Sequence, residues 1–243
     1  MDLQLTGLKA VVTGGSMGIG ASIVRTLAAE GCHVAFCARG EERVAAMLAT
    51  LKGLPGSVVA RPLDVTDSTQ FEDWVSELGS CDIFIPNVSA LSGNWDEALR
   101  VDVQATIRTT EAILPYVQNS KCGAITYIGS KAGSLAAPTS AAYGAAKAAM
   151  AHYMRSLSSR LLPAIRVNIV SPGDTMFDGG LWDGIRMNDP AQFDRVLGRN
   201  PMGRLARPEE VARVVAFVSS PAASFVSGAN WYVDGGSISH VQI

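Results

Sequence analysis

The chain has 243 residues, of which 48% are hydrophobic and 17% charged, and its formal net charge at pH 7 is −2. This composition excludes a disordered chain, and the lack of a long run of one charge argues against a nucleic-acid or anionic-lipid surface. No apolar run is long enough for a transmembrane helix and the start lacks a signal-peptide pattern, so we expect a cytoplasmic protein without membrane or nucleic-acid partners.

Apolar runs alternate with amphipathic segments along the whole chain. We predict strands at residues 8–15, 33–39, 57–65, 81–87, 123–129, 165–173 and 228–236. We predict helices at residues 19–31, 41–53, 68–78, 95–118, 140–161 and 207–220. Gly31 and Gly53 are expected to end the first two helices, and Ser68 to cap the third. The alternation predicts an α/β fold of the Rossmann type, a doubly wound parallel sheet with helices on both faces.

No Pro/Gly/Ser linker or repeat divides the chain, so residues 1–243 are predicted to form a single dinucleotide-binding oxidoreductase domain. The irregular segment at about 174–207 is too long for a simple connection and is predicted to be a substrate lid. The four cysteines are widely spaced and are predicted to be buried free thiols. Because the three histidines have no ligand spacing to them, we predict no metal site.

The stretch "TGGSMGIG", residues 13–20, joins the first strand to the first helix. Gly14 permits the tight turn, Gly18 lets the backbone approach a diphosphate, and Gly20 lets the helix pack closely on the strand. Ser16, Met17 and Ile19 complete the predicted cofactor loop. A glycine-rich stretch can be merely a sharp turn, but its place between strand and helix favours a dinucleotide site.

The end of the second strand indicates which dinucleotide is bound. An acidic residue there would select NAD, whereas this strand ends in Ala38 and Arg39. Arg39 can pair with a 2′-phosphate, and the Ser16 hydroxyl can assist it, so NADP(H) is favoured over NAD(H). The alternative is that Arg39 is an exposed loop cation, and the glycine loop itself holds no second cation.

Tyr143 and Lys147 stand four residues apart on one face of a predicted helix. A nearby ammonium and an oxidised nicotinamide would both lower the pKa of the phenol, which could then exchange a proton with an alcohol or alkoxide. Lys147 could also orient the nicotinamide ribose. Ser130, at the end of the fifth strand, can hold the substrate oxygen against Tyr143 in the manner of an oxyanion hole.

With these motifs, "DVTD" at 64–67, "PNVS" at 86–89, "SPG" at 171–173 and "GANWYVDGG" at 228–236, the chain resembles the short-chain dehydrogenases/reductases from about Leu8 to Gly236. The resemblance implies a seven-stranded parallel sheet and hydride transfer between NAD(P) and a carbonyl or alcohol carbon. It implies a homo-oligomer, tetramer or dimer, with the helices at 95–118 and 140–161 in one contact. It also implies roles for residues at matching positions: catalysis for Ser130, Tyr143 and Lys147, adenine contacts for Asp64 and Val65, cofactor support for Asn87, and the nicotinamide-side turn for Pro172 and Gly173.

Three departures from the family pattern stand out. The family's Asn-Asn-Ala-Gly turn reads Pro-Asn-Val-Ser here, ending at Ser89. Asp102 stands where the family has a catalytic asparagine that supports a proton relay from the lysine. Asp102 either takes that role beside Lys147 or is a helix carboxylate that faces water or pairs with Arg100 or Arg108. Thr175 lies only two residues past Gly173, closer than the family threonine that contacts the nicotinamide amide.

Candidate pocket residues in the loops after the fourth, fifth and sixth strands are mainly apolar and aromatic, and no convergent cation is apparent among them. We therefore predict an NADP-dependent oxidoreductase of an apolar ketone or secondary alcohol. Two alternatives stay open. One is a catalytically weak NADP-sensing or binding protein of the same fold, and the other is an NAD-dependent alcohol dehydrogenase.

Overall fold

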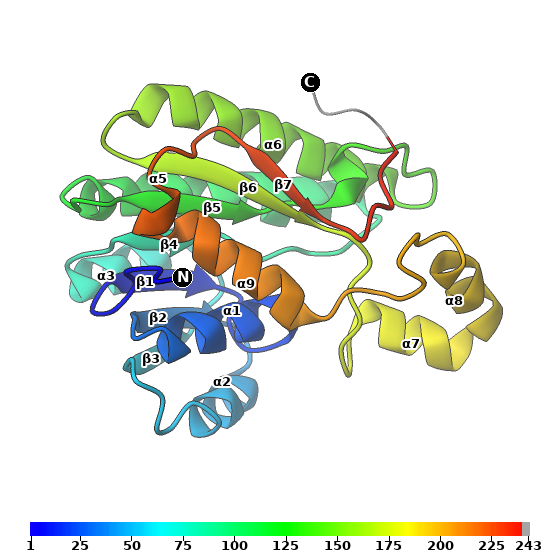
Figure 1. Cartoon of the computed structure of the whole chain (residues 1–243), viewed down its shortest axis with the longest axis horizontal. Coiled ribbons are helices and arrows are strands. Elements are labelled where there is room, and N and C mark those ends of the chain that lie inside the picture. Colours follow the sequence, from blue (N-terminus) through cyan, green and yellow to red (C-terminus); the bar gives the residue numbers. More distant parts are fainter. Residues whose placement is uncertain (240–243) are drawn as a thin grey trace.

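The computed structural model describes residues 1–239, and within them a parallel sheet of seven strands has the order β3-β2-β1-β4-β5-β6-β7 (Figure 1). Each neighbouring pair of strands is parallel, so the carboxyl ends of all of them lie at one edge. The strands are β1 Lys9–Thr13, β2 His33–Ala38, β3 Val58–Pro62, β4 Ile83–Ile85, β5 Ala124–Ile128, β6 Arg166–Pro172 and β7 Asn230–Val233.

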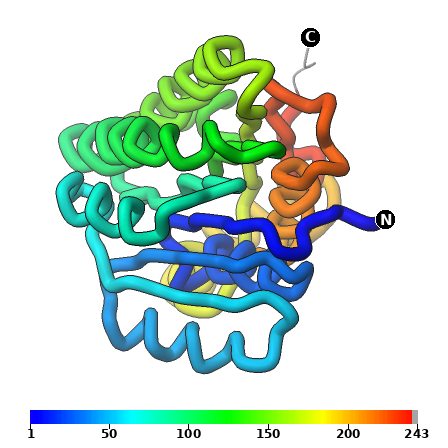
Figure 2. The backbone as a smooth tube through the Cα atoms, turned by 90° about the vertical axis from the view of Figure 1, so that its left-hand side faces the viewer, coloured from blue at the N-terminus to red at the C-terminus, as the bar shows by residue number. Residues whose placement is uncertain are grey.

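Helices cover both faces of the sheet because successive strand residues point to opposite sides. Val12 packs in a core with side chains of α1, α2 and α9, whereas Val11 packs with those of α3, α5 and α6. Figure 2 shows α3 and α5 on one side of the sheet and α9 on the other. The helical elements are α1 Gly18–Ala29, α2 Glu41–Ala49, α3 Ser68–Leu78, α4 Trp95–Glu97, the π-helical η1 Ala98–Ala105, α5 Thr106–Val117, the 3₁₀ turn η2 Lys131–Gly133, α6 Ala141–Leu161, α7 Leu181–Asn188, α8 Pro190–Leu197, α9 Pro208–Ser219 and the 3₁₀ turn η3 Pro221–Ala223. The predicted Rossmann-type architecture is confirmed.

Three helix boundaries can be compared with the sequence-based predictions. Gly31 follows the first helix with φ of +86°, as predicted. Gly53 also has a positive φ, but α2 already ends at Ala49, so that prediction was wrong by one turn. Ser68 was predicted to cap α3; instead the Asp67 side chain accepts the Gln70 amide at 3.1 Å. A carboxylate one residue earlier satisfies the same amide and complements the helix dipole.

Residues 174–207, here called the lid, were predicted to be irregular, but they contain two short helices, α7 and α8, which lie beside the sheet (Figure 1). Its two ends meet at a parallel bridge between Thr175 and Ala206. The Met176 amide donates to the Ala206 carbonyl at 2.8 Å, and the Ala206 amide donates to the Asp174 carbonyl at 2.9 Å. The two ends of the lid are therefore held together near the carboxyl end of β6.

The cysteines are free thiols, three of them buried. Within residues 1–239 no group of three or more His, Cys, Asp or Glu side chains is placed to hold a metal ion. His240, one of the three histidines considered above, lies outside the described residues. None of the helices in this part of the chain is long and apolar enough to cross a membrane.

Candidate active site

The strand order reverses between β1 and β4: β2 and β3 lie on one side of β1, and β4 to β7 lie on the other. The loops after β1 and β4 meet at this point. Asn87, just after β4, donates its side-chain amide to the carbonyls of Thr13 and Gly14 at 3.0 and 3.2 Å. Its backbone amide donates to the Thr13 hydroxyl at 3.0 Å. Asn87 thus fixes the start of the glycine loop at the switch point, where α/β sheets bind ligands.

The glycine loop is built for close contact. A side chain at Gly20 would place a Cβ 2.1 Å from the Gly14 carbonyl oxygen, so only glycine lets α1 start this near β1. Gly18 has φ of +55°, and the ring of Phe177 from the lid lies against it. No side chain among residues 1–239 caps the N-terminus of α1. Amides at this helix end are left to bind an anion, which fits the diphosphate of a dinucleotide.

Two arginines lie near the outer part of this loop. Arg39 is exposed after β2, and its charge helps to stabilise the Asp64 carboxylate. Burial alone would raise the pKa of Asp64, but the two hydrogen bonds from Thr66 and the charges of Arg39 and Arg100 outweigh it and lower the pKa. Arg43, in the first turn of α2, approaches the Met17 sulfur at 3.7 Å. Arg43 was not among the predicted cofactor residues, because it lies on the helix after β2 and not in the glycine loop.

Ser130, Tyr143 and Lys147 converge, as their positions on β5 and α6 predict. The Ser130 hydroxyl lies close enough to the Tyr143 phenol to lower its pKa. The Lys147 ammonium lies 5.7 Å from the centroid of the Tyr143 ring and donates to the Ile128 carbonyl at 3.1 Å. Ser130 also accepts the Ala132 amide at 3.1 Å, which fixes its rotamer at the start of η2. A phenol, a hydroxyl and an ammonium therefore meet at the carboxyl edge of the sheet.

The pKa of Tyr143 is raised above its ordinary value, which differs from the sequence-based expectation of a lowered pKa. Burial is the largest cause, because it disfavours the charged phenolate. Lys147 and the Ser130 hydrogen bond act in the predicted direction and lower the pKa, while Tyr127 and Asp102 raise it. The phenol is therefore protonated at neutral pH.

Asp102 is fully buried on η1 and faces Lys147, not water. Its Oδ1 lies 3.5 Å from the Lys147 ammonium, and both side chains are at most 2% exposed. Ser89 donates its hydroxyl to Asp102 Oδ1, and the Ala90 amide donates to Oδ2 at 3.1 Å. Arg100 and Arg108, the alternative partners, make no ion pair with Asp102 among the described residues. Ser89 and Asp102, two of the departures from the family pattern, contact each other directly.

Tyr127 on β5 is a further neighbour that the sequence analysis missed, since it stands within an apolar strand. The Lys147 ammonium lies 5.0 Å from the centroid of its ring. Its hydroxyl is buried and has no hydrogen-bond partner among the residues that the structure describes. Burial, and secondarily the charge of Asp102, raises the pKa of Tyr127 well above its ordinary value. The buried lysine is thus held by one carboxylate, one carbonyl and two aromatic rings.

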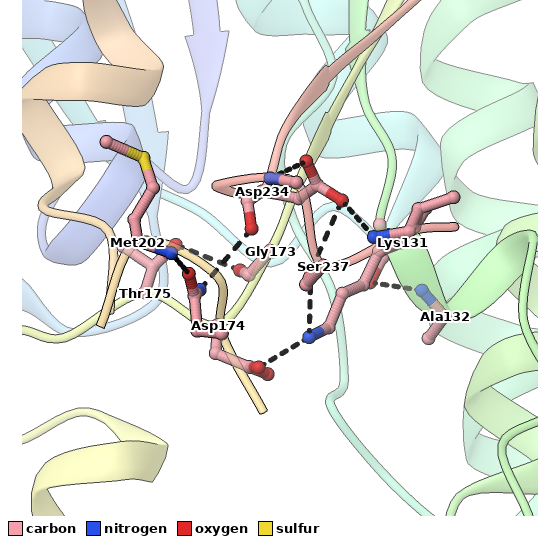
Figure 3. Close-up of polar contacts among 12 residues, drawn as sticks. Lys131, Ala132, Gly173, Asp174, Thr175, Met202, Asp234 and Ser237 are labelled. Carbon is pink, nitrogen blue, oxygen red and sulfur yellow. Dashed lines mark hydrogen bonds and ion pairs between the residues drawn. The ribbon is translucent and has the colours of Figure 1, made fainter. Parts of the chain in front are cut away.

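The turn after β6 is held firmly by β7. The Gly173 amide donates to the Val233 carbonyl at 2.9 Å, and a Cβ at Gly173 would lie 2.7 Å from the Asp234 Cα (Figure 3). Thr175 is buried, and its hydroxyl donates to the Gly173 carbonyl at 3.1 Å. That hydroxyl therefore stabilises the turn itself, and it would have to leave this bond to contact a cofactor.

Over nearly its whole length the chain is similar to known oxidoreductases. A family model described as enoyl-(acyl carrier protein) reductase matches residues 14–237. Isoepoxydon dehydrogenase of Penicillium expansum is 33% identical over 96% of this chain and 95% of its own. Cis-4-hydroxycyclohexanecarboxylate dehydrogenase of Sinomonas cyclohexanicum is 34% identical over 93% and 95%. The NADP complex of RhlG from Pseudomonas aeruginosa has a TM-score of 0.89 at 30% identity, covering 97% of this chain and 98% of that one.

Proposed function

The chain belongs to the short-chain dehydrogenase/reductase family and is an oxidoreductase acting on CH–OH or C=O groups, and from this we propose that it reduces an apolar ketone with NADPH. The reverse reaction oxidises the secondary alcohol with NADP⁺. The observation that carries the proposal is the convergence of Ser130, Tyr143 and Lys147 at the sheet edge that also holds the glycine loop. The NADP complex of a relative with 30% identity supports the choice of cofactor.

The nicotinamide, when bound, supplies a hydride to the carbonyl carbon. In our proposal the residues of the chain manage the oxygen. Ser130 donates a hydrogen bond to the carbonyl oxygen, and Tyr143 gives it a proton as negative charge develops there. The product is the alcohol, with hydride on carbon and the phenol proton on oxygen. Lys147 stabilises the phenolate that remains and orients the nicotinamide ribose.

We propose that Asp102 is the fourth member of this site. Its contact with Lys147 at 3.5 Å neutralises the buried ammonium, and Ser89 and the Ala90 amide hold the carboxylate in place. Because Asp102 raises the pKa of Tyr143, it favours the protonated phenol, the form that ketone reduction uses. A catalytically weak sensor would not need such a set of buried polar contacts beside its phenol, so we favour the enzyme.

For the cofactor, we propose that Arg39 and Arg43 together bind the 2′-phosphate of NADP. Arg39→Asp should raise the Kd for NADPH by at least about tenfold, since a charge-assisted contact is lost and a like charge introduced. Arg43→Met should have a smaller effect in the same direction. Fluorescence titration with NADPH and NADH measures both, and Arg213→Gln, exposed on α9, is the control. Unchanged NADPH affinity in both variants would refute the assignment and favour NAD.

The raised pKa of Tyr143 predicts opposite pH dependences for the two directions. Reduction uses the protonated phenol, so its kcat/KM should stay level through neutral pH and fall only near or above the ordinary phenol pKa of about 10. Oxidation needs the phenolate, so its kcat/KM should rise with pH over the same range. Profiles measured in both directions test this, and an oxidation rate that falls with rising pH would contradict it.

We also propose that the protein assembles as a homo-oligomer, a dimer or tetramer, through the faces of α5 and α6 that point away from the sheet. It is proposed to act in the cytoplasm. Light scattering after gel filtration tests the assembly, and a monomer at micromolar concentration would contradict it.

A further inference from the structure

A cavity of about 270 Å³ lies at the base of the lid. Four segments that are distant in sequence form its wall: the turn after β5, the loop after β6, the end of α8 and the segment after β7. The lining residues are Lys131, Leu135, Asp174, Val196, Arg199, Asn200 and Ser237. The cavity is thus walled on one side by the sheet edge and on the other by the lid.

The wall of the cavity adjoins Ser130 along the chain. Lys131 lines the cavity and directly follows Ser130, which in our proposal holds the substrate oxygen, and adjacent Cα atoms lie about 3.8 Å apart. The part of a small substrate that extends from its carbonyl group toward the lid would meet this wall.

The charges in the cavity do not cancel. Lys131 donates to Asp174 at 2.5 Å and to the Ser237 hydroxyl at 3.3 Å (Figure 3). Asp174 therefore neutralises Lys131, and their side chains are 16–21% exposed. Arg199 is exposed and forms no ion pair with any of residues 1–239. Asp234, behind Ser237, is occupied by its own turn, where it accepts the amides at 236 and 238.

We propose that this cavity is a subsite for a carboxylate carried by the substrate, so that the substrate class is an oxo acid, or its hydroxy acid, with an apolar body. The inference rests on the proposed function and narrows it. Arg199 supplies the planar donor fork that suits a carboxylate. Leu135 and Val196 supply apolar contact for the body of the molecule. Lys131 and Arg199 are far apart in the sequence and come together only in the folded chain. No convergent cation was predicted for the substrate pocket.

Binding of an unreactive acid tests the subsite without turnover. Calorimetry in the presence of NADP⁺ compares benzoate with benzamide, which have the same ring but differ in charge. We expect benzoate to bind more tightly than benzamide. In Arg199→Gln the ratio of the two affinities should fall by roughly three- to tenfold. Arg195→Gln is the matched control, since Arg195 is an exposed arginine of α8, four residues before Arg199, and does not line the cavity. Asp174→Asn should strengthen benzoate binding, because it removes the opposing carboxylate.

Equal affinity for benzoate and benzamide, or equal losses in the two arginine variants, would overturn the subsite. Turnover separates this from the parent proposal. With NADPH, 4-acetylbenzoate should be reduced with a higher kcat/KM than its methyl ester. Reduction of the ester with no preference for the acid leaves the proposed function standing and rejects the subsite. If no ketone of a broad panel is reduced with either cofactor, the proposed function fails, and the benzoate titration still decides the subsite.

Discussion

Tyr143→Phe should lower kcat for ketone reduction by about 10²- to 10⁴-fold, the range expected when a general acid is removed. The variant loses only the phenol hydroxyl, while the ring that faces Lys147 remains. NADPH should therefore bind with nearly unchanged affinity. Steady-state kinetics with a ketone and fluorescence titration with NADPH measure the two quantities separately.

Tyr153→Phe is a matched control for this loss. Tyr153 lies on the same helix, and its hydroxyl donates to Glu111 at 2.7 Å, outside the catalytic group. Removal of the Tyr153 hydroxyl should leave kcat within about twofold of the wild-type value, because a partly exposed hydrogen bond contributes only modestly to stability and this one does not contact Ser130, Tyr143 or Lys147. Full activity in Tyr143→Phe would reject the proposed mechanism, and equal losses in both variants would show that the helix, not the phenol, was disturbed.

The meeting of Ser130, Tyr143 and Lys147 could be predicted from sequence because two simple geometric rules place them. Residues four apart share a helix face, so Tyr143 and Lys147 must be neighbours on α6. The carboxyl ends of parallel strands share one edge, so Ser130 must lie near the first turn of that helix. The glycine loop follows the same logic, with a 2.1 Å approach at Gly20 that only glycine allows. Local pattern is enough wherever one element or one sheet edge determines the geometry.

Other features depend on contacts between elements that pattern alone does not relate. The sequence did not decide whether Asp102 lies beside Lys147 or instead faces water or pairs with Arg100 or Arg108. Its burial depends on how η1 packs against α6, and the π-helical winding of η1 changes which residues face inward. The net pKa shift of Tyr143 was likewise out of reach, because burial, its largest cause, is a property of the folded site. The meeting of Lys131 and Arg199 depends on where the lid lies.

The buried pair of Lys147 and Asp102 allows a stability prediction with a large expected effect. Lys147→Met preserves the length of the side chain but leaves the Asp102 carboxylate buried without its counter-charge. Breaking such a pair from one side typically costs about 3–5 kcal/mol of unfolding free energy. Asp102 keeps its bonds from Ser89 and the Ala90 amide, which places the expected cost at the lower end of that range.

The partner variant and the double variant show whether charge is the cause. Asp102→Asn should cost less, about 1–3 kcal/mol, because Lys147 keeps the Ile128 carbonyl and two aromatic rings. In the double variant neither charge remains, and the asparagine can still accept the Ala90 amide. We therefore expect the double variant to be more stable than Lys147→Met alone, a sign that additive losses cannot produce. Urea unfolding of the four proteins at neutral pH measures the coupling. If the double variant were as unstable as the sum of the single changes, the two side chains would be independent, and the carboxylate at 102 would have no electrostatic role in holding Lys147.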